Sequence, residues 1–234
     1  MSQISIQAHD LSIRFKDRLL FHIPQLSVGP QEAIYLSGDN GVGKTTLLKI
    51  LSGLQKPTTG KVNLQQTSLL TRLFKGRTQG GVIYMHQTPY MFDGTVFDNV
   101  CYGLKFTISN RQIRRTEAIN ALRMVGLETL ADEHISVLSG GERQRVAMAR
   151  AWVLKPGVLL MDESSASLDQ ESIERQVVLA EDLIERGTSL VITSHQKNAL
   201  TALCRRQWTI TNTKLIERAD LQLVDEDNNE YAYA

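Results

Sequence analysis

A glycine-rich segment at residues 38–45 constrains this chain more than any other part of the sequence. The segment reads GDNGVGKT and fits the pattern GxxxxGKT, in which x is any residue. An apolar run at residues 33–36 precedes it, and apolar residues at helical spacing follow it at residues 47–51. Glycines let backbone N–H groups converge on a phosphate, and a helix amino terminus adds partial positive charge. The segment therefore predicts a strand, a phosphate-binding loop and a helix, in that order.

Residues of this loop are candidates for contact with a bound phosphate chain and its cation. The Lys44 ammonium would bind the phosphates and assist catalysis, and the Thr45 hydroxyl would be a ligand of Mg²⁺. The alternative is an ordinary glycine turn, which the strand-to-helix context disfavours. The other loop residues expected to bind a nucleotide are Gly38, Asp39, Asn40, Gly41, Val42, Gly43 and Thr46.

An acidic pair, Asp162 and Glu163, follows the apolar run at residues 158–161. The second ligand of the cation is expected at the end of such a strand, so Asp162 would hold Mg²⁺ through water. At the carboxyl end of a strand the chain turns, so the Glu163 carboxylate can reach the water that attacks the γ-phosphate. The alternative is a solvated acidic pair, which the phosphate loop earlier in the chain disfavours.

A second pair of glycines marks the start of a later helix. Ser139 and Glu142 are spaced as a capping box, and the apolar residues that follow continue a helix that must end before Pro156. A capped helix start with Gly140 and Gly141 exposes N–H groups and the helix dipole to an anion. An ordinary helix cap is the alternative, although a cap needs neither glycine.

The overall pattern predicts an α/β fold: a phosphate-loop NTPase core with a mostly parallel sheet, an amino-terminal antiparallel β layer and an inserted helical subdomain. Apolar residues alternate from Ile4 to Phe15, which predicts half-buried strands with a turn near residues 9–10. Later in the chain the spacing becomes mainly helical, and Gly126 is placed to end one of these helices.

We expect one domain over residues 1–234. Within it, residues 1–88 and 157–215 would form the catalytic core with its β layer. Residues 89–156 would form the helical subdomain, and residues 216–234 would be a carboxyl-terminal tail that is poorly ordered from Asp225 onward.

Composition excludes several other classes of protein. The net charge is +1, from 26 basic and 25 acidic residues, so no overall field would attract nucleic acid. Cys101 and Cys204 form no CxxC pair, so we expect reduced thiols and neither a disulfide nor a zinc site. The sequence has no signal-peptide pattern and no apolar run near the roughly 20 residues that cross a bilayer.

Residues 138–145, LSGGERQR, closely resemble the LSGGQ signature of the ABC ATPase family, and the resemblance extends over residues 4–215. The sequence also shows the family's other motifs in order. These are the phosphate loop, Gln87 after a strand, the signature, the acidic pair, the sequence SLD at 167–169, and His195 after a strand.

The resemblance implies roles for residues that carry little signal alone. Gln87 would contact Mg²⁺ or the attacking water, and His195 would hydrogen-bond the γ-phosphate and position that water. Phe15 resembles the aromatic residue that stacks on adenine. The alternatives are a surface or internally satisfied side chain for Gln87 and His195, and a core strand residue for Phe15.

The family resemblance also implies ATP and Mg²⁺ as cofactors and a second ATPase subunit as a partner. Two such domains pack head to tail, so Ser139, Gly140 and Gly141 of one subunit would close on ATP held by the other, with Asp169 at the interface. Loss of the γ-phosphate would remove the contact that favours the closed state. A homodimer is the simplest case, because the chain carries a full catalytic set.

The predicted function is the ATP-hydrolysing subunit of an ABC transporter, peripheral on the cytoplasmic face of the membrane. The resemblance favours import with separate permease subunits, and indirectly a solute-binding protein. Residues 86–95 would form part of the groove for a permease helix and look most like importers of oxyanions such as tungstate or phosphate. The alternatives are an exporter ATPase, a non-transport ABC ATPase of DNA repair or translation, and a module that binds ATP without hydrolysing it.

Overall fold

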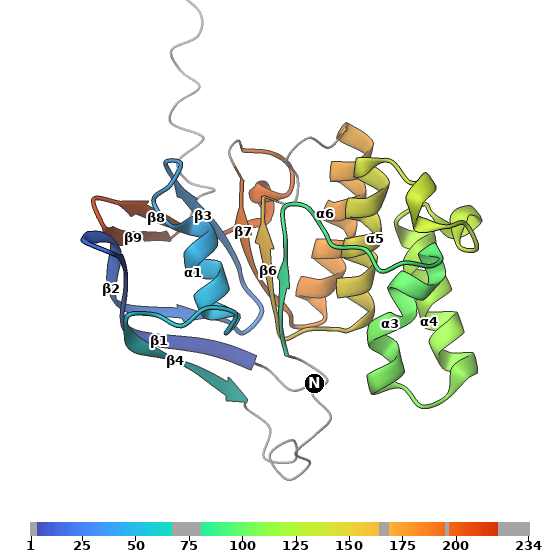
Figure 1. Ribbon diagram of the computed structural model, residues 1–234, viewed down its shortest axis with the longest axis horizontal. Helices are drawn as coiled ribbons and strands as arrows, with labels where there is room; N and C mark the ends of the chain where they lie inside the picture. Colours follow the sequence, from blue (N-terminus) through green and yellow to red (C-terminus); the bar gives the residue numbers. More distant parts are fainter. Residues whose placement is uncertain (1–3, 67–80, 164–168, 195–196, 220–234) are drawn as a thin grey trace, which may run out of the picture.

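The computed structural model describes residues 4–66, 81–163, 169–194 and 197–219. These residues form two sheets, one of three strands in the order β2-β1-β4 and one of six strands in the order β5-β6-β7-β3-β8-β9 (Figure 1). The strands are β1 (Ile4–Phe15), β2 (Arg18–Val28), β3 (Ala33–Gly38), β4 (Thr59–Gln66), β5 (Val82–Met85), β6 (Val158–Asp162), β7 (Ser189–Thr193), β8 (Arg206–Thr211) and β9 (Lys214–Ala219).

The smaller sheet is antiparallel, as the alternating sequence predicts, but the expected turn at residues 9–10 is wrong. Strand β1 continues through this point with Asp10 in a left-handed conformation, φ 54°, and its pairing with β4 shifts register between His9 and Ser12. The buried face changes here, from even positions such as Ala8 to odd positions such as Leu11. The interruption of the apolar alternation is therefore a β-bulge within one strand and not a turn between two strands.

The larger sheet is the parallel core of the domain. Strands β5, β6, β7, β3 and β8 run parallel, and β9 joins the edge antiparallel to β8. Every residue of β6 and β7 is buried, which explains their unbroken apolar sequences. Because β9 extends to Ala219, the sheet includes the first residues of the segment that we expected to be a tail.

Helices cover both faces of this sheet. Helix α1 (Lys44–Leu51) lies on one face together with the antiparallel sheet, and the remaining α-helices lie on the other face (Figure 1). The latter are α3 (Val96–Thr107), α4 (Arg111–Met124), α5 (Gly140–Val153) and α6 (Gln170–Glu185). Short 3-10 turns occupy Glu128–Leu130, Ile135–Val137 and Thr201–Leu203.

The helix ends follow the sequence signals. Gly126 has a φ of 69° just beyond α4, and α5 stops at Val153, before Pro156. Helices α3, α4 and α5 fall within residues 89–156, but the division into a core and a helical subdomain stays a prediction. In the described part of the chain, no helix is both long enough and apolar enough to span a membrane.

Candidate nucleotide site at the ends of the parallel strands

The glycine-rich loop joins β3 to α1 in a shape that requires glycine at two positions. Gly38 and Gly43 have φ values of 142° and 107°, which side chains with a Cβ rarely adopt. A Cβ at Gly38 would lie 2.7 Å from the Ile210 carbonyl oxygen, and one at Gly43 would lie 3.0 Å from the Phe21 ring. The tip at Asp39, Asn40 and Gly41 is exposed. The loop is therefore held closely against the sheet and open at its outer edge.

Positive charge is placed directly at this loop. The Lys44 side chain is 7% exposed, and its ammonium donates hydrogen bonds to the carbonyl oxygens of Gly38 at 2.7 Å and Asp39 at 3.2 Å. Gly43 is the N-cap of α1 and offers no side-chain acceptor to the first turn. The first N–H groups of a helix have no partner within the helix, so they are available to an anion here.

Asp162 lies at the end of β6, where the sequence predicts a metal-binding carboxylate. The residue is 3% exposed, and its Oδ1 accepts hydrogen bonds from Thr45 Oγ1 and Thr193 Oγ1, both at 3.1 Å. Its Oδ2 accepts one from the Tyr84 hydroxyl at 2.7 Å. Two of the three predicted metal-binding side chains, Thr45 and Asp162, are therefore in direct contact. Their oxygen atoms suit Mg²⁺, a hard cation that prefers oxygen ligands.

Sequence reasoning missed Tyr84 and Thr193. They lie on β5 and β7, the strands that flank β6, so they meet Asp162 only once the strand order is known. Burial raises the pKa of Tyr84, and the hydrogen bond to Asp162 raises it further, so the phenol remains a donor at neutral pH. The sequence signal for them is a hydroxyl-bearing residue close to the carboxyl end of an apolar strand: Tyr84 is next to last in β5, and Thr193 is last in β7.

Glu163 follows Asp162 at a sharp bend. Its φ is 49°, and its N–H donates to Thr193 Oγ1 at 2.8 Å. The Thr193 hydroxyl therefore accepts from the Glu163 backbone and donates to Asp162, which fixes the two acidic residues relative to each other. The bend agrees with the predicted turn at the strand end, although the role of Glu163 as a base stays a prediction.

Gln87 lies in the exposed segment that follows β5. Its carbonyl oxygen accepts a hydrogen bond from Nε2 of Gln144, a residue of α5 that is 6% exposed. Arg150, also on α5, donates to the Tyr90 carbonyl oxygen at 2.9 Å. Two side chains of α5 thus hold the main chain of this segment. Contact of the Gln87 side chain with a cation or water stays a prediction.

The signature residues form the predicted capping box at the start of α5. The Glu142 N–H donates to Ser139 Oγ at 3.2 Å, and the Ser139 N–H donates to Glu142 Oε2 at 2.8 Å. The second of these bonds holds the pKa of Glu142 below its usual value. Ser139 and Gly140 are exposed, and a Cβ at Gly140 would meet no atom within 4 Å. The helix start is therefore open to another molecule, but contact with a second subunit's ATP stays a prediction, as it does for Gly141.

Two of the remaining predicted residues have clear surroundings. Phe15 is 52% exposed at the end of β1, so it is not a core residue and its ring has free surface. Asp169 is the N-cap of α6 and accepts from the Ser172 N–H at 2.8 Å. Hydrogen bonding to the Ser172 side chain, and then to its N–H, holds the pKa of Asp169 below its usual value. Their predicted contacts with adenine and with a second subunit are not tested. His195 and the first two residues of the SLD sequence lie outside the described residues.

Together, the fold and site define a phosphate-loop nucleotide-binding domain, and comparison with known proteins narrows the class. The family model described as ABC transporter matches residues 21–166, more than half of the chain. This chain therefore belongs to the ABC transporter family. Members of the family bind ATP with Mg²⁺, in agreement with the predicted cofactors.

Two curated relatives show how much of a longer protein the chain corresponds to. The methionine import ATP-binding protein of Bacillus subtilis is 32% identical over 201 residues, which cover 84% of this chain and 59% of the relative. The spermidine/putrescine import ATP-binding protein of Mycoplasma capricolum is 38% identical over 182 residues, which cover 72% and 48%. The chain thus spans about half to three fifths of these relatives.

Solved structures confirm the predicted fold class. A dimeric ATP-binding cassette in a post-hydrolysis state, bound to ADP and Pi, superposes with a TM-score of 0.76 at 25% identity, covering 92% of this chain and 98% of that one. A nucleotide-free cassette from an ABC transporter has a TM-score of 0.76 at 19% identity, covering 97% and 94%, and shows the likeness of fold alone.

Proposed function

We propose that this chain is the ATP-binding and ATP-hydrolysing subunit of an ABC importer. One observation carries the ATP-hydrolysing part of this proposal: the fold brings the Thr45 hydroxyl onto the Asp162 carboxylate at 3.1 Å, beside the buried Lys44 and directly before Glu163. These groups come from separate parts of the sequence, and together they supply a phosphate-binding cation, oxygen ligands for Mg²⁺ and a carboxylate for proton transfer.

Each residue has a distinct chemical role in this proposal. The loop N–H groups and Lys44 bind the phosphates and stabilise negative charge as it develops on them. Thr45 and Asp162 hold Mg²⁺, which neutralises charge on the phosphates when it is bound. Glu163 accepts a proton from the attacking water. Gln87 and His195 orient that water, and Phe15 stacks on the adenine ring.

The working unit in this proposal is a homodimer. The start of α5, with Ser139 exposed at its N-cap, presents helix N–H groups and dipole outward, which suits the phosphates of ATP on a second copy. Asp169 then lies at the interface between the copies. The post-hydrolysis cassette bound to ADP and Pi, 25% identical to this chain, is dimeric, which supports this arrangement.

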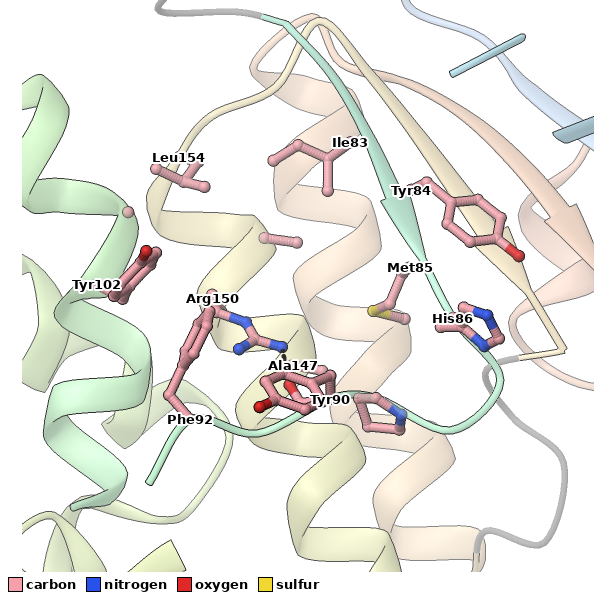
Figure 2. A pocket seen from close by; sticks show the side chains of 13 residues that line it. Ile83, Tyr84, Met85, His86, Tyr90, Phe92, Tyr102, Ala147, Arg150 and Leu154 are labelled. Atoms are coloured by element: carbon pink, nitrogen blue, oxygen red, sulfur yellow. Dashed lines mark hydrogen bonds between the residues drawn. The ribbon is translucent and has the colours of Figure 1, made fainter. Parts of the chain in front are cut away.

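A groove beside α5 supplies a docking site for a permease subunit. It has a volume of about 360 Å³ and is lined by aromatic and aliphatic side chains from β5, the segment after it, α3 and α5 (Figure 2). Phe92 and Tyr102 stack with ring centroids 4.2 Å apart, and the Arg150 guanidinium lies 5.5 Å from the Phe92 ring. An apolar groove with a cationic wall suits the end of an amphipathic helix.

The transported solute is the least constrained part of the proposal. The relatives described above are named for import of methionine and of spermidine/putrescine, which supports import. They give no support to the predicted oxyanion, tungstate or phosphate, so that specificity stays a prediction. The proposed location is the cytoplasmic face of the membrane, where permease subunits would hold the chain and a solute-binding protein would deliver the solute.

Co-purification tests the transport role. The tagged chain, isolated from gently solubilised native membranes, should bring an integral membrane protein with it, identified by mass spectrometry. Tyr90, which lines the groove and is 76% exposed, can be changed to Asp to disrupt docking. Val178→Asp, on α6 at 52% exposure, is a control outside the groove lining.

The two variants give opposite expectations. Tyr90→Asp should lose the membrane protein, while Val178→Asp should retain it. Recovery of DNA or ribosomes with no membrane protein would contradict the transport role and favour a non-transport ABC ATPase.

A further inference from the structure

Tyr84 is a residue of the site for which the sequence motifs give no role. It lies on β5, paired with Leu160 of the neighbouring strand β6. Its backbone belongs to the wall of the groove, but the ring points away from Phe92 and Tyr102 (Figure 2). The hydroxyl instead reaches Oδ2 of Asp162 at 2.7 Å. Tyr84 therefore connects the strand that leads to Gln87 with the carboxylate at the centre of the site.

The hydrogen bonds of Asp162 are divided unequally between its two oxygen atoms. Oδ1 accepts from Thr45 and from Thr193, both at 3.1 Å. Among the residues that the structure describes, Tyr84 supplies the one hydrogen bond to Oδ2. The bond is the shortest of the three and joins a phenol to a carboxylate that is 3% exposed. Hydrogen bonds to ionised acceptors are about twice as strong as neutral ones.

This division fixes the rotation of the carboxylate about its bond to Cβ. The terminal torsion of an aspartate is broad, so an unrestrained carboxylate samples many orientations. Tyr84 anchors Oδ2 from the β5 side, which leaves Oδ1 directed at Thr45. A hydroxyl that gives a lone pair to a cation keeps its O–H, so Thr45 can still donate to Oδ1 at a metal site. Tyr84 holds the oxygen atom that Thr45 and Thr193 do not, and the three donors together fix the carboxylate.

We propose that Tyr84 is a positioning residue of the magnesium site, whose hydroxyl sets the orientation in which Asp162 serves the cation. The inference rests on the proposed function, since it assumes that Asp162 and Thr45 hold Mg²⁺. Partners that orient a metal ligand typically contribute about 10- to 100-fold to metal affinity. Tyr84 does not touch the phosphate loop in any hydrogen bond of the described structure, so nucleotide binding without metal does not depend on it.

The test compares metal affinity with nucleotide affinity in Tyr84→Phe, which removes one oxygen atom and keeps the ring. Mn²⁺ takes the same oxygen ligands as Mg²⁺ and can be titrated by electron paramagnetic resonance in the presence of a non-hydrolysable ATP analogue. Binding of a fluorescent ATP analogue in EDTA reports on the phosphate loop alone. We expect Mn²⁺ affinity to fall about tenfold or more, with metal-free nucleotide affinity unchanged.

Trp152→Phe is the matched control. The Trp152 indole N–H donates to Asp182 Oδ2 at 2.6 Å, so this variant also removes an aromatic donor from a carboxylate, between α5 and α6. It should lower the melting temperature without changing Mn²⁺ affinity. If Tyr84→Phe behaves in the same way, Tyr84 is a structural residue only and the inference is wrong.

Two further outcomes separate the inference from the proposed function. Equal losses of Mn²⁺ and metal-free nucleotide affinity in Tyr84→Phe would mean a general distortion of the site and would overturn the positioning role. Failure of the unaltered chain to bind Mn²⁺ with nucleotide would overturn the proposed function itself, and the inference with it.

Discussion

The carboxyl ends of the parallel strands and the groove beside α5 form two neighbouring sites with opposite kinds of lining. At the strand ends, charged and polar side chains such as Asp162 and Lys44 are buried and hydrogen-bonded. In the groove, Tyr90 and Tyr102 are large apolar side chains left exposed, at 76% and 42%. The two sites are therefore suited to different ligands. Fixed polar groups suit a small charged molecule, and an open aromatic wall suits a protein helix.

The two regions are joined by one short segment of chain. Strand β5 contributes Tyr84 to the site at the strand ends, and residues 86–92 after it form one side of the groove. Two α5 side chains, Gln144 and Arg150, bond to carbonyl oxygens of this segment. A helix docked in the groove would therefore press on the segment that carries Gln87. If one region binds nucleotide and the other binds a partner helix, a substitution in one region should spare the ligand of the other.

The largest expected effect is on nucleotide affinity. Lys44→Ala removes a buried ammonium from the phosphate loop, so ATP affinity should fall about 100-fold, as for loss of a charged hydrogen bond. Titration with a fluorescent ATP analogue measures it. Tyr90→Ala, in the groove, should bind the analogue like the unaltered chain, and a loss there would show that the two regions are not separate.

A smaller effect is expected where the regions meet. Gln144→Met keeps the side-chain volume but removes the donor to the Gln87 carbonyl oxygen. Turnover should fall by about tenfold, the loss of one hydrogen bond's free energy, while ATP affinity is unchanged. Thr188→Val is the control, because it removes a buried donor to the Pro156 carbonyl oxygen at 2.7 Å, outside the site. Equal turnover in both variants would mean that Gln144 does not support Gln87.

A still smaller effect is expected from loss of the capping box of α5. Ser139→Ala should lower the free energy of unfolding by about 1 kcal/mol, measured by denaturant titration. Asn110→Ala removes the N-cap of α4, where its side chain accepts from Gln112 and Ile113, and should cost the same. Only the Ser139 variant should also slow hydrolysis, because only that helix start faces ATP in the proposed dimer. Equal hydrolysis by the two variants would argue against the dimer contact.

The smallest effect is expected on the free energy of unfolding when an exposed groove residue is removed. Tyr90→Ala removes a side chain that is 76% exposed, so the free energy of unfolding should change by less than about 0.5 kcal/mol. Leu160→Ala, in the fully buried strand β6, should cost about 2 to 5 kcal/mol. A large loss from Tyr90→Ala would mean that the groove aromatics form part of the core.

The sequence predicted the site where its residues are contiguous and failed where the site depends on strand order. The phosphate loop, the capping box and the acidic pair are local patterns, in which residues close together in the chain determine the structure. Tyr84 and Thr193 meet Asp162 through the pairing of β5 and β7 with β6, which no local pattern contains. The sequence predicts a turn where β1 has a bulge at Asp10, because turns and bulges both interrupt the alternation of apolar residues.

Phosphate release by Glu163→Gln shows whether the strand ends form an ATP-hydrolysing site with Glu163 as the base. At saturating ATP and Mg²⁺, turnover should fall about 100-fold or more, because proton transfer to a positioned base contributes that much. ATP affinity should be retained, and an ATP-bound dimer should accumulate. Turnover equal to that of the unaltered chain would mean that Glu163 is not the base.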